Sequence, residues 1–321
     1  MRSVDAALRA AGHELQLLPD GVSEDELVRA LGDAELLLMC YTPVTARAIA
    51  SAPRLRGIVK YGVGIDAIDI EAAKAHGIAV VNVPEYAEET VAEGAFALMI
   101  ALAKKLKPIQ REMDAKGWAW PASQWLGLDL AGKTLGLVGV GKIGSSLARM
   151  AQGFRMRVVG FSPNSLLPPG VEKRTHLQEM LAECDFVSIH CVLNDETRGL
   201  IGERELAVMR PTSFLVNTAR GAIVDEAALL RALQERRIAG AALDVYAQEP
   251  LAKSGHPLSA LYAMDNVILS PHLTFYTHEA MARLEAETLE RCMEVLERRP
   301  VLVKSRDPRL RSQRQGVRFA D

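Results

Sequence analysis

The sequence predicts an α/β protein with two domains, each built on a doubly wound parallel sheet, and with the first domain discontinuous in the chain. Three observations support this fold class. A chain of 321 residues is too long for one ordinary core. Short apolar runs of strand length alternate with helical patterns along most of the sequence. The last amphipathic helical pattern, 277–299, follows the second set of strands and is expected to pack back on the first domain.

The first domain is expected to hold a small parallel sheet. Its apolar runs have the length and composition of buried strands, and they are 34–39, 55–60 and 78–82. The chain opens on a helical pattern, 4–11, followed by a strand-like run, 14–18, whereas a unit of this kind normally begins with a strand. We therefore expect that one strand of this sheet is missing or is supplied from elsewhere.

A long helical pattern, 88–116, is interrupted only by Pro108 and is expected to bridge the two domains. After a loop with three tryptophans, six further apolar runs alternate with helical patterns, as in a doubly wound sheet. These runs are 135–138, 157–161, 186–190, 213–217, 240–243 and 266–269. We place the first domain at 1–103 and 277–304, the second at 104–276, and a mobile basic tail at 305–321.

Composition excludes several classes of function. The net charge is −2 with both signs interspersed, so neither nucleic acid nor a membrane surface is an expected partner. The longest apolar stretch, 94–103, is far shorter than the ~20 residues of a membrane span, and the N-terminus has no signal-peptide pattern. The four cysteines show no metal-ligand spacing, so we expect no metal site and a cytoplasmic protein with reduced thiols.

A glycine motif predicts a dinucleotide site in the second domain. The segment GVGKIG places Gly139, Gly141 and Gly144 directly after a strand and at the head of a helix. These glycines would allow a tight turn, close approach of the backbone to a pyrophosphate, and close packing of the helix. The N–H groups of the helix start, at Lys142 and Ile143, would then face the anion. Because each domain is expected to hold a doubly wound parallel sheet, both domains are expected to be Rossmann-like.

The sequence leaves the choice between NAD and NADP open. The strand after the glycine motif should end in an acidic residue that binds the adenosine ribose of NAD, but Ser162 stands there. A serine would not repel a 2′-phosphate, yet no arginine follows at once, and the nearest basic pair is Lys173 and Arg174.

Three residues after the later strands have the chemistry needed to reduce a 2-keto acid. Arg220 could bind a carboxylate through two parallel hydrogen bonds, which fixes both charge and orientation. His272 could give a proton to the carbonyl oxygen, and Glu249 could stabilise its imidazolium form. Because the carboxyl ends of parallel strands meet at one edge of a sheet, we expect these three side chains to lie near the nicotinamide.

Four segments, GVGKIG, VNTARG, ALDVYAQEP and SPHLTFYT, occur in this order, and the chain as a whole resembles the D-isomer-specific 2-hydroxyacid dehydrogenases. The resemblance implies hydride transfer between the nicotinamide of NAD or NADP and C2 of a small 2-hydroxy or 2-keto acid. In that family the three motif residues bind the substrate carboxylate, support the histidine and act as the acid/base. These roles fall on Arg220, Glu249 and His272, respectively.

The resemblance also implies further contacts and a homodimer built around the cofactor domains. Asp244, Thr218 and Ala219 would contact the cofactor near its nicotinamide, and Thr90 and Val91 would face it. In the first domain, the N–H groups of Val63 and Gly64 would bind the substrate carboxylate together with Arg220.

Departures from the family pattern bear on the substrate. Phosphoglycerate-type members carry arginines in a stretch that here reads Met39, Cys40, Tyr41, Thr42, so an unphosphorylated substrate is expected. Phe275 and Tyr276, in a segment like that of D-lactate dehydrogenases, add bulk near the site. Glyoxylate, hydroxypyruvate, pyruvate and larger keto acids stay open as substrates.

Two other interpretations compete with a 2-hydroxyacid dehydrogenase. A corepressor-like scaffold would bind NAD(H) and act through partners without turnover, but the sequence keeps all three catalytic candidates. A formate or phosphite dehydrogenase would use the same fold, but formate-type members carry a glutamine before their histidine, where Pro271 stands here.

Overall fold

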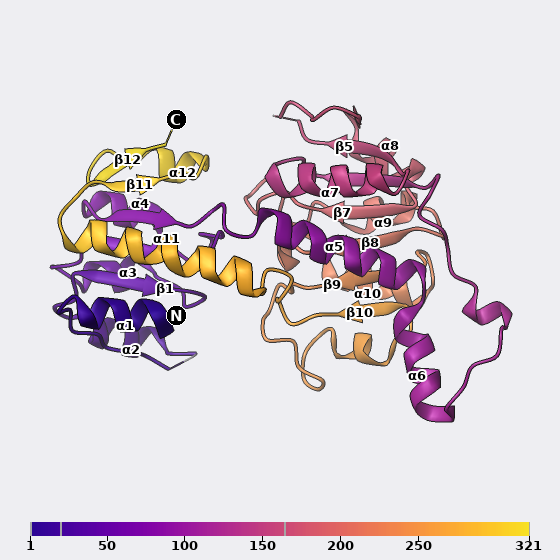
Figure 1. The fold of residues 1–321 in the computed structure, drawn as a ribbon, viewed down its shortest axis with the longest axis horizontal. Helices are drawn as coiled ribbons and strands as arrows, with labels where there is room; N and C mark the ends of the chain where they lie inside the picture. Colours follow the sequence, from indigo (N-terminus) through magenta and orange to yellow (C-terminus); the bar gives the residue numbers. More distant parts are fainter. Residues whose placement is uncertain (1, 20, 164, 321) are drawn as a thin grey trace. The chain divides into compact units, whose positions relative to one another are not determined.

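The computed structural model describes residues 2–19, 21–163 and 165–320. It divides into two units: unit 1 comprises Met1–Ala87 and Thr277–Asp321, and unit 2 comprises Glu88–Tyr276. Figure 1 shows their elements in the colours of the sequence. The first unit is thus discontinuous, as predicted.

Unit 1 is built on a parallel sheet in the order β1-β2-β3. Its strands are β1 (Leu36–Met39), β2 (Gly57–Lys60) and β3 (Ala79–Asn82), and its early helices are α1 (Arg2–Ala10), α2 (Glu24–Leu31), α3 (Ala46–Ala50) and α4 (Ile70–Ala75). The strand expected at 14–18 is wrong: these residues, all described, form no strand, although Leu15 packs against the core. Alternating leucines at 15 and 17 produced the strand pattern without a sheet partner.

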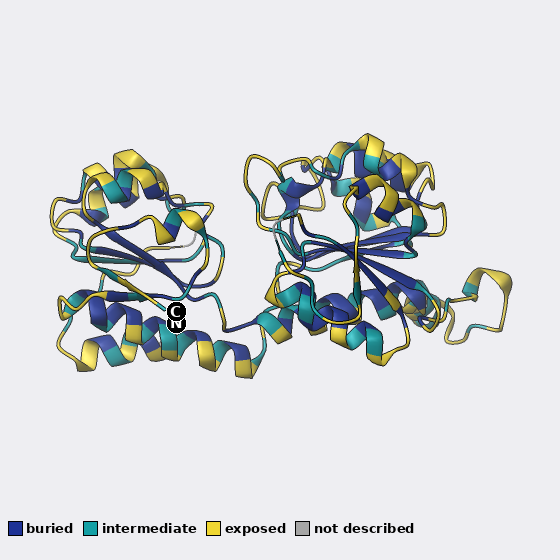
Figure 2. Ribbon diagram, turned by 90° about the horizontal axis from the view of Figure 1, so that it is seen from above, coloured by how far each residue is buried: buried dark blue, intermediate teal, exposed yellow. Residues whose placement is uncertain are grey.

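The last long helix returns to unit 1 as predicted. α11 (His278–Leu296) places Cys292 and Val295 in the core of this unit. A Cβ at Gly57 on β2 would lie 2.5 Å from the Val295 side chain, so the helix packs directly on the sheet backbone. Helices lie on both faces of the sheet (Figure 2).

The basic C-terminal stretch is not the expected mobile tail. It follows β11 (Val301–Val303) and forms α12 (Pro308–Arg311) and β12 (Val317–Phe319), and β12 pairs with β11. The buried Gln313 accepts a hydrogen bond from Val80 N–H at 2.7 Å and donates one to Val80 C=O at 2.9 Å. Its amide therefore covers the outer edge of β3. The hydrophobic pattern of the sequence could not predict this role, because a single buried glutamine creates no apolar periodicity.

Unit 2 contains a parallel sheet of seven described strands in the order β10-β9-β8-β7-β4-β5-β6. The strands are β4 (Thr134–Val138), β5 (Arg157–Phe161), β6 (Val171–Lys173), β7 (Phe186–Ile189), β8 (Phe214–Asn217), β9 (Gly240–Leu243) and β10 (Val267–Leu269). The sequence predicted six of these and missed β6, a short edge strand with two exposed charged residues.

Helices cover both faces of this sheet, as in a doubly wound fold (Figure 2). The helices are α5 (Glu88–Ala103), α6 (Leu106–Lys116), α7 (Lys142–Gly153), α8 (Leu177–Glu183), α9 (Glu203–Val208) and α10 (Glu226–Gln234), with short 3-10 turns η1 (Ser123–Trp125), η2 (Gly221–Ile223) and η3 (Ser259–Ala263). One apolar core joins the sheet to α5 and α7, and a second joins it to α8, α9 and α10.

The predicted boundary at 103/104 differs from the one in the structure, which falls between Ala87 and Glu88. The reason is that α5 buries Phe96 and Met99 in the core of unit 2. The predicted break at Pro108 is also displaced. Lys105 adopts a left-handed conformation with φ of 52° and separates α5 from α6, whereas Pro108 lies in the first turn of α6, where proline is tolerated.

Candidate active site

The two halves of the unit 2 sheet diverge between β4 and β7. From β4 the chain builds outward through β5 and β6, and from β7 it builds the other way through β8, β9 and β10. Ligands of open α/β sheets bind at such a switch point, outside the carboxyl ends of the strands. All the unit 2 residues that the sequence selected after strands lie in loops at this edge.

The glycine motif forms a tight turn between β4 and α7. Gly139 has φ of 90°, and a Cβ there would lie 2.5 Å from the backbone nitrogen of Cys191. A Cβ at Gly144 would lie 2.6 Å from Gly139 C=O, so this glycine allows the helix to approach the turn. At Gly141, by contrast, no described atom lies within 4 Å of that position. Within the described part of the chain no side chain caps α7, so its first N–H groups fit an anion such as a pyrophosphate.

The other predicted cofactor residues of unit 2 follow β5 and β8 or lie on α5 and α7. Thr218, after β8, is buried, and its hydroxyl has no hydrogen-bond partner among the described residues, which fits a bond to a ligand. Ser162 directly follows β5 and is also buried. Lys142 pairs with Glu88 at 3.0 Å, and Thr90 on α5 is buried. Ile143 is half-buried in the first turn of α7.

His272 and Glu249 meet as the sequence predicts. Glu249 follows β9 and His272 follows β10, and the His272 Nδ1 atom lies 2.9 Å from Glu249 Oε2. Burial raises the pKa of Glu249, but the hydrogen bond and charge of His272, the N–H of Tyr246 and the charge of Arg220 together hold that pKa below its usual value. Glu249 is therefore a carboxylate at neutral pH, and Nδ1 is the donor.

Arg220 follows β8, which neighbours β9 in the sheet. Its Nη1 donates a hydrogen bond to Ala219 C=O at 2.7 Å, and Asn217 Nδ2 donates one to Arg220 C=O at 2.9 Å. Arg220, Glu249 and His272 thus follow the neighbouring strands β8, β9 and β10, and the charge of Arg220 helps to lower the pKa of Glu249. A cation, a proton donor and a carboxylate at adjacent strand ends can orient and protonate a keto acid.

Asp244 has a role that sequence reasoning missed. It is fully buried after β9, and its carboxylate accepts hydrogen bonds from the N–H groups of Leu273 and Thr274 at 2.9 and 3.0 Å and from the Thr274 hydroxyl at 2.6 Å. These bonds hold the loop in which His272 has a left-handed φ of 58°. Its predicted contact with the cofactor stays a prediction.

Aromatic rings follow His272 directly. The centroid of Phe275 lies 6.1 Å from that of His272, and the Tyr276 ring lies 5.9 Å from Phe275, both edge-on. Tyr276 is exposed. The added bulk expected from these residues is thus present beside the imidazole.

The predicted substrate contacts of unit 1 follow β2. Val63 C=O accepts a hydrogen bond from Asn82 Nδ2 at 2.6 Å, and Gly64 is half-buried. The stretch 39–42 carries no cation of its own, but the Lys60 ammonium donates to Cys40 C=O and lies 4.9 Å from the Tyr41 ring centroid. The sequence could not indicate this approach, because Lys60 belongs to the neighbouring strand.

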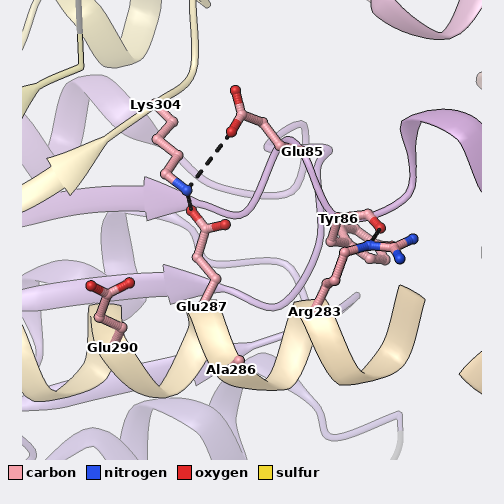
Figure 3. A pocket seen from close by; sticks show the side chains of 7 residues that line it. All are labelled: Glu85, Tyr86, Arg283, Ala286, Glu287, Glu290 and Lys304. Atoms are coloured by element: carbon pink, nitrogen blue, oxygen red, sulfur yellow. Dashed lines mark hydrogen bonds and ion pairs between the residues drawn. The ribbon is translucent and has the colours of Figure 1, made fainter. Parts of the chain in front are cut away.

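A cavity of about 560 Å³ lies on unit 1 (Figure 3). Its walls include α11 residues and Lys304, whose ammonium pairs with Glu287 at 3.0 Å and Glu85 at 3.7 Å. Arg283 Nε donates to Tyr86 C=O at 2.8 Å. Because these charged groups already pair with one another, we regard the sheet edge of unit 2 as the stronger candidate site.

The described residues contain no cluster of His, Cys, Asp or Glu that could hold a metal ion. Over the same part of the chain, no helix is both long and apolar enough to cross a bilayer. The four cysteines, Cys40, Cys184, Cys191 and Cys292, form no disulfide among the described residues.

The doubly wound sheet, the glycine turn and the paired histidine and carboxylate together define a nicotinamide-dependent oxidoreductase. Residues 96–274 match the family model of the D-isomer specific 2-hydroxyacid dehydrogenase NAD-binding domain. A glyoxylate reductase from Korarchaeum cryptofilum is 40% identical over 289 residues, which cover 86% of this chain and 85% of that protein. The chain belongs to the D-isomer-specific 2-hydroxyacid dehydrogenase family, and it is an oxidoreductase that acts on CH–OH groups.

Solved structures agree with this assignment. A D-lactate dehydrogenase from Aquifex aeolicus complexed with NAD and lactic acid has a TM-score of 0.81 and 30% identity, covering 92% of this chain and 93% of that one. An acyclic imino acid reductase in complex with NADPH and D-Arg has a TM-score of 0.83 and 29% identity, covering 93% and 94%. Both cofactors thus occur among the neighbours, and nothing in these comparisons supports a scaffold without turnover.

Proposed function

We propose that this chain reduces a small, unphosphorylated 2-keto acid of the size of glyoxylate to its 2-hydroxy acid, with D configuration where C2 is chiral, and that it catalyses the reverse oxidation. The observation that carries the proposal is the 2.9 Å contact between His272 Nδ1 and Glu249 Oε2, at strand ends of the sheet that carries the glycine turn. The relatives named glyoxylate reductase support the choice of a short substrate.

Each side chain has one task in this proposal. Arg220 binds the substrate carboxylate and orients the keto group. His272 Nε2 donates a proton to the carbonyl oxygen during reduction and accepts it during oxidation, while Glu249 holds the ring and stabilises its charge. When bound, the nicotinamide supplies or accepts the hydride. The N–H groups of Val63 and Gly64 give the carboxylate further donors.

The glycine turn, Lys142, Ile143 and the N-terminus of α7 hold the pyrophosphate in this proposal. Thr90, Thr218, Ala219 and Asp244 contact the rest of the cofactor, and Ser162 lies at the adenosine ribose. The orphaned, buried Thr218 hydroxyl supports this assignment, because a bound cofactor would give it a partner.

We also propose a cytoplasmic homodimer. The four cysteines, none of which forms a disulfide among the described residues, are consistent with a reducing compartment. For the dimer, the support is the arm of unit 2 formed by α6 and residues 117–126 (Figure 1), since none of the α6 residues, all of them described, is buried. Trp118, Trp120 and Leu126 are 60%, 77% and 72% exposed, an unusual apolar surface for a monomer.

A spectrophotometric assay tests the proposed reaction. NADH and NADPH are each mixed with glyoxylate, hydroxypyruvate, pyruvate, a branched keto acid and a phosphorylated 2-keto acid, and loss of the reduced-nicotinamide absorbance is followed. We expect turnover with a short unphosphorylated acid. Cofactor binding without turnover on any acid would refute the proposal, and preference for the phosphorylated acid would refute the assigned substrate class.

A further inference from the structure

One carboxylate outside the proposed reaction touches the loop that carries Glu249. Glu226 begins α10, and its Oε1 accepts a hydrogen bond from Ala247 N–H at 2.7 Å. Burial raises the pKa of Glu226 above its ordinary value, and the charge of Glu249 acts in the same direction, against the Ala247 N–H and His256. The structure thus keeps a partly buried carboxylate at Glu226 although burial and the charge of Glu249 both disfavour its ionised form.

The position of the Glu249 carboxylate depends on the conformation of the loop 246–249. Glu249 Oε1 accepts from Tyr246 N–H at 3.0 Å, while its Oε2 faces His272. The carboxylate is therefore tied to the backbone immediately before Ala247. Any displacement of that backbone moves the oxygen that orients the imidazole.

Other contacts hold this loop from its remaining sides. The Tyr246 hydroxyl donates toward the carbonyls of Leu243 and Ser270, each at 3.0 Å, and His256 Nε2 lies 3.0 Å from Gln248 C=O. A Cβ at Gly221 would overlap the backbone of Tyr246 and Ala247. At Ala247 N–H, the side-chain acceptor is Glu226, which ties the loop to α10.

We infer that Glu226 is a positioning residue: it holds the 246–249 loop against α10 and thereby places the Glu249 carboxylate for its bond to His272. The kinetic consequence rests on the proposed function, whereas the chain of contacts rests on the structure alone. The required feature is an acceptor oxygen of the right reach. A glutamine at 226 keeps that oxygen and loses only the charge, while a methionine keeps the length and loses the acceptor.

The test compares Glu226→Met with Glu226→Gln, with Glu235→Met at the other end of α10 as the matched control. Glu235 pairs with Arg237 on the surface. In Glu226→Met we expect kcat to fall about tenfold with KM and NADH affinity within about twofold, since small misplacements of a catalytic group are costly. The glutamine variant and the control should keep kcat within about twofold of wild type.

A spectroscopic measurement follows the contact without needing activity. The Nδ1–H proton of His272, bonded to Glu249, should give a downfield imidazole resonance, assigned by its loss in His272→Gln. We expect this resonance to broaden or move upfield in Glu226→Met and to persist in Glu226→Gln. If Glu226→Met does not fold by circular dichroism, the shorter Glu226→Ala variant takes its place.

Wild-type kcat and an unshifted resonance in the methionine variant would overturn the inference. So would equal damage in the glutamine variant, because the charge and not the acceptor would then matter. If the wild-type protein turns over no 2-keto acid while the resonance behaves as expected, the proposed function fails and the positioning role stands.

Discussion

At the scale of single residues, His272 has the largest expected effect. Replacing His272 with alanine removes the proton donor but leaves the glycine turn intact. We expect kcat to fall by roughly 10² or more while NADH affinity, measured by fluorescence titration, persists. Arg220→Ala serves as the contrast, since it should mainly raise KM for the keto acid. An alanine variant of His272 with wild-type kcat would contradict the assigned role.

Ser162 offers a second test, of cofactor choice. It directly follows β5 and carries no carboxylate, and the ammonium of Lys173 donates to the C=O of the next residue, Pro163, at 3.3 Å. Ser162→Asp adds a group that binds a ribose hydroxyl and repels a 2′-phosphate. We expect the ratio of kcat/KM for NADH to that for NADPH to rise at least about tenfold. Ser162→Asn is the uncharged control, and an unchanged ratio in the aspartate variant would exclude this contact.

Sequence order predicted the catalytic candidates because each follows a strand of a parallel sheet, and parallel strands end at one edge. The same reasoning could not find Glu226 or the loop bonds of Asp244. Both depend on how a loop folds back on a helix or on another loop, and this leaves no period in the sequence. Lys60 was missed for a similar reason, since only the pairing of β1 with β2 brings it to Cys40.

At the scale of elements, ionic contacts join β5, β6 and α8. Arg157 donates to Glu172 and Glu183. The hydrogen bonds that Glu172 accepts from Arg157 and then from Arg174 lower the pKa of Glu172 to about 2. A carboxyl group whose pKa is lowered on folding stabilises the protein above its unfolded pKa, and that stability is lost as the pH falls toward the folded value. This contribution is therefore full above about pH 4.5 and lost toward about pH 2.

The corresponding prediction concerns Glu172→Gln. We expect the variant to have a lower Tm than wild type at pH 7, and the difference to shrink as the pH falls from about 4.5 toward 2. Differential scanning calorimetry across this range measures it, with the exposed Glu179→Gln as control. A Tm difference that does not depend on pH would show that the bonds act through packing instead.

The cover on β3 gives a further prediction. Gln313→Ala would leave the N–H and C=O of Val80 without their side-chain partner, at a cost of about 1–3 kcal/mol in the free energy of unfolding. Denaturant unfolding measures the loss, and the exposed Gln315→Ala is the control. Equal stability of the two variants would mean that water replaces the amide at this edge.

Strands with continuous apolar runs were the elements that the sequence predicted best. β4, β5, β7, β8, β9 and β10 all lie within one or two residues of their expected bounds. The short strands β6 and β12 were missed, since β6 carries charges and β12 follows a glycine in a basic stretch, whereas 14–18 has the alternation of a strand without forming one. An edge element is stabilised on one side only, so its sequence is less constrained by burial.

At the scale of the whole molecule, oligomerisation is the property most open to test. Replacing Trp118 and Trp120 together with serine should weaken the proposed dimer and shift the mass measured by light scattering or sedimentation toward the monomer. Leu166→Ser, which is also exposed on unit 2, is the control. A monomeric wild-type protein, or a double variant that stays fully dimeric, would contradict the role of the arm.

Along the chain, unit 2 lies between the two segments of unit 1, and this order has a consequence for biosynthesis. Unit 2 is one continuous stretch, so it can fold as soon as it leaves the ribosome. Unit 1 cannot complete its core at that time, because Cys292 and Val295 of α11 are synthesised only afterwards. While unit 2 is made, the part of β1, β2 and β3 that α11 later covers stays exposed. The nascent chain is therefore most exposed to chaperones and to aggregation through its oldest residues.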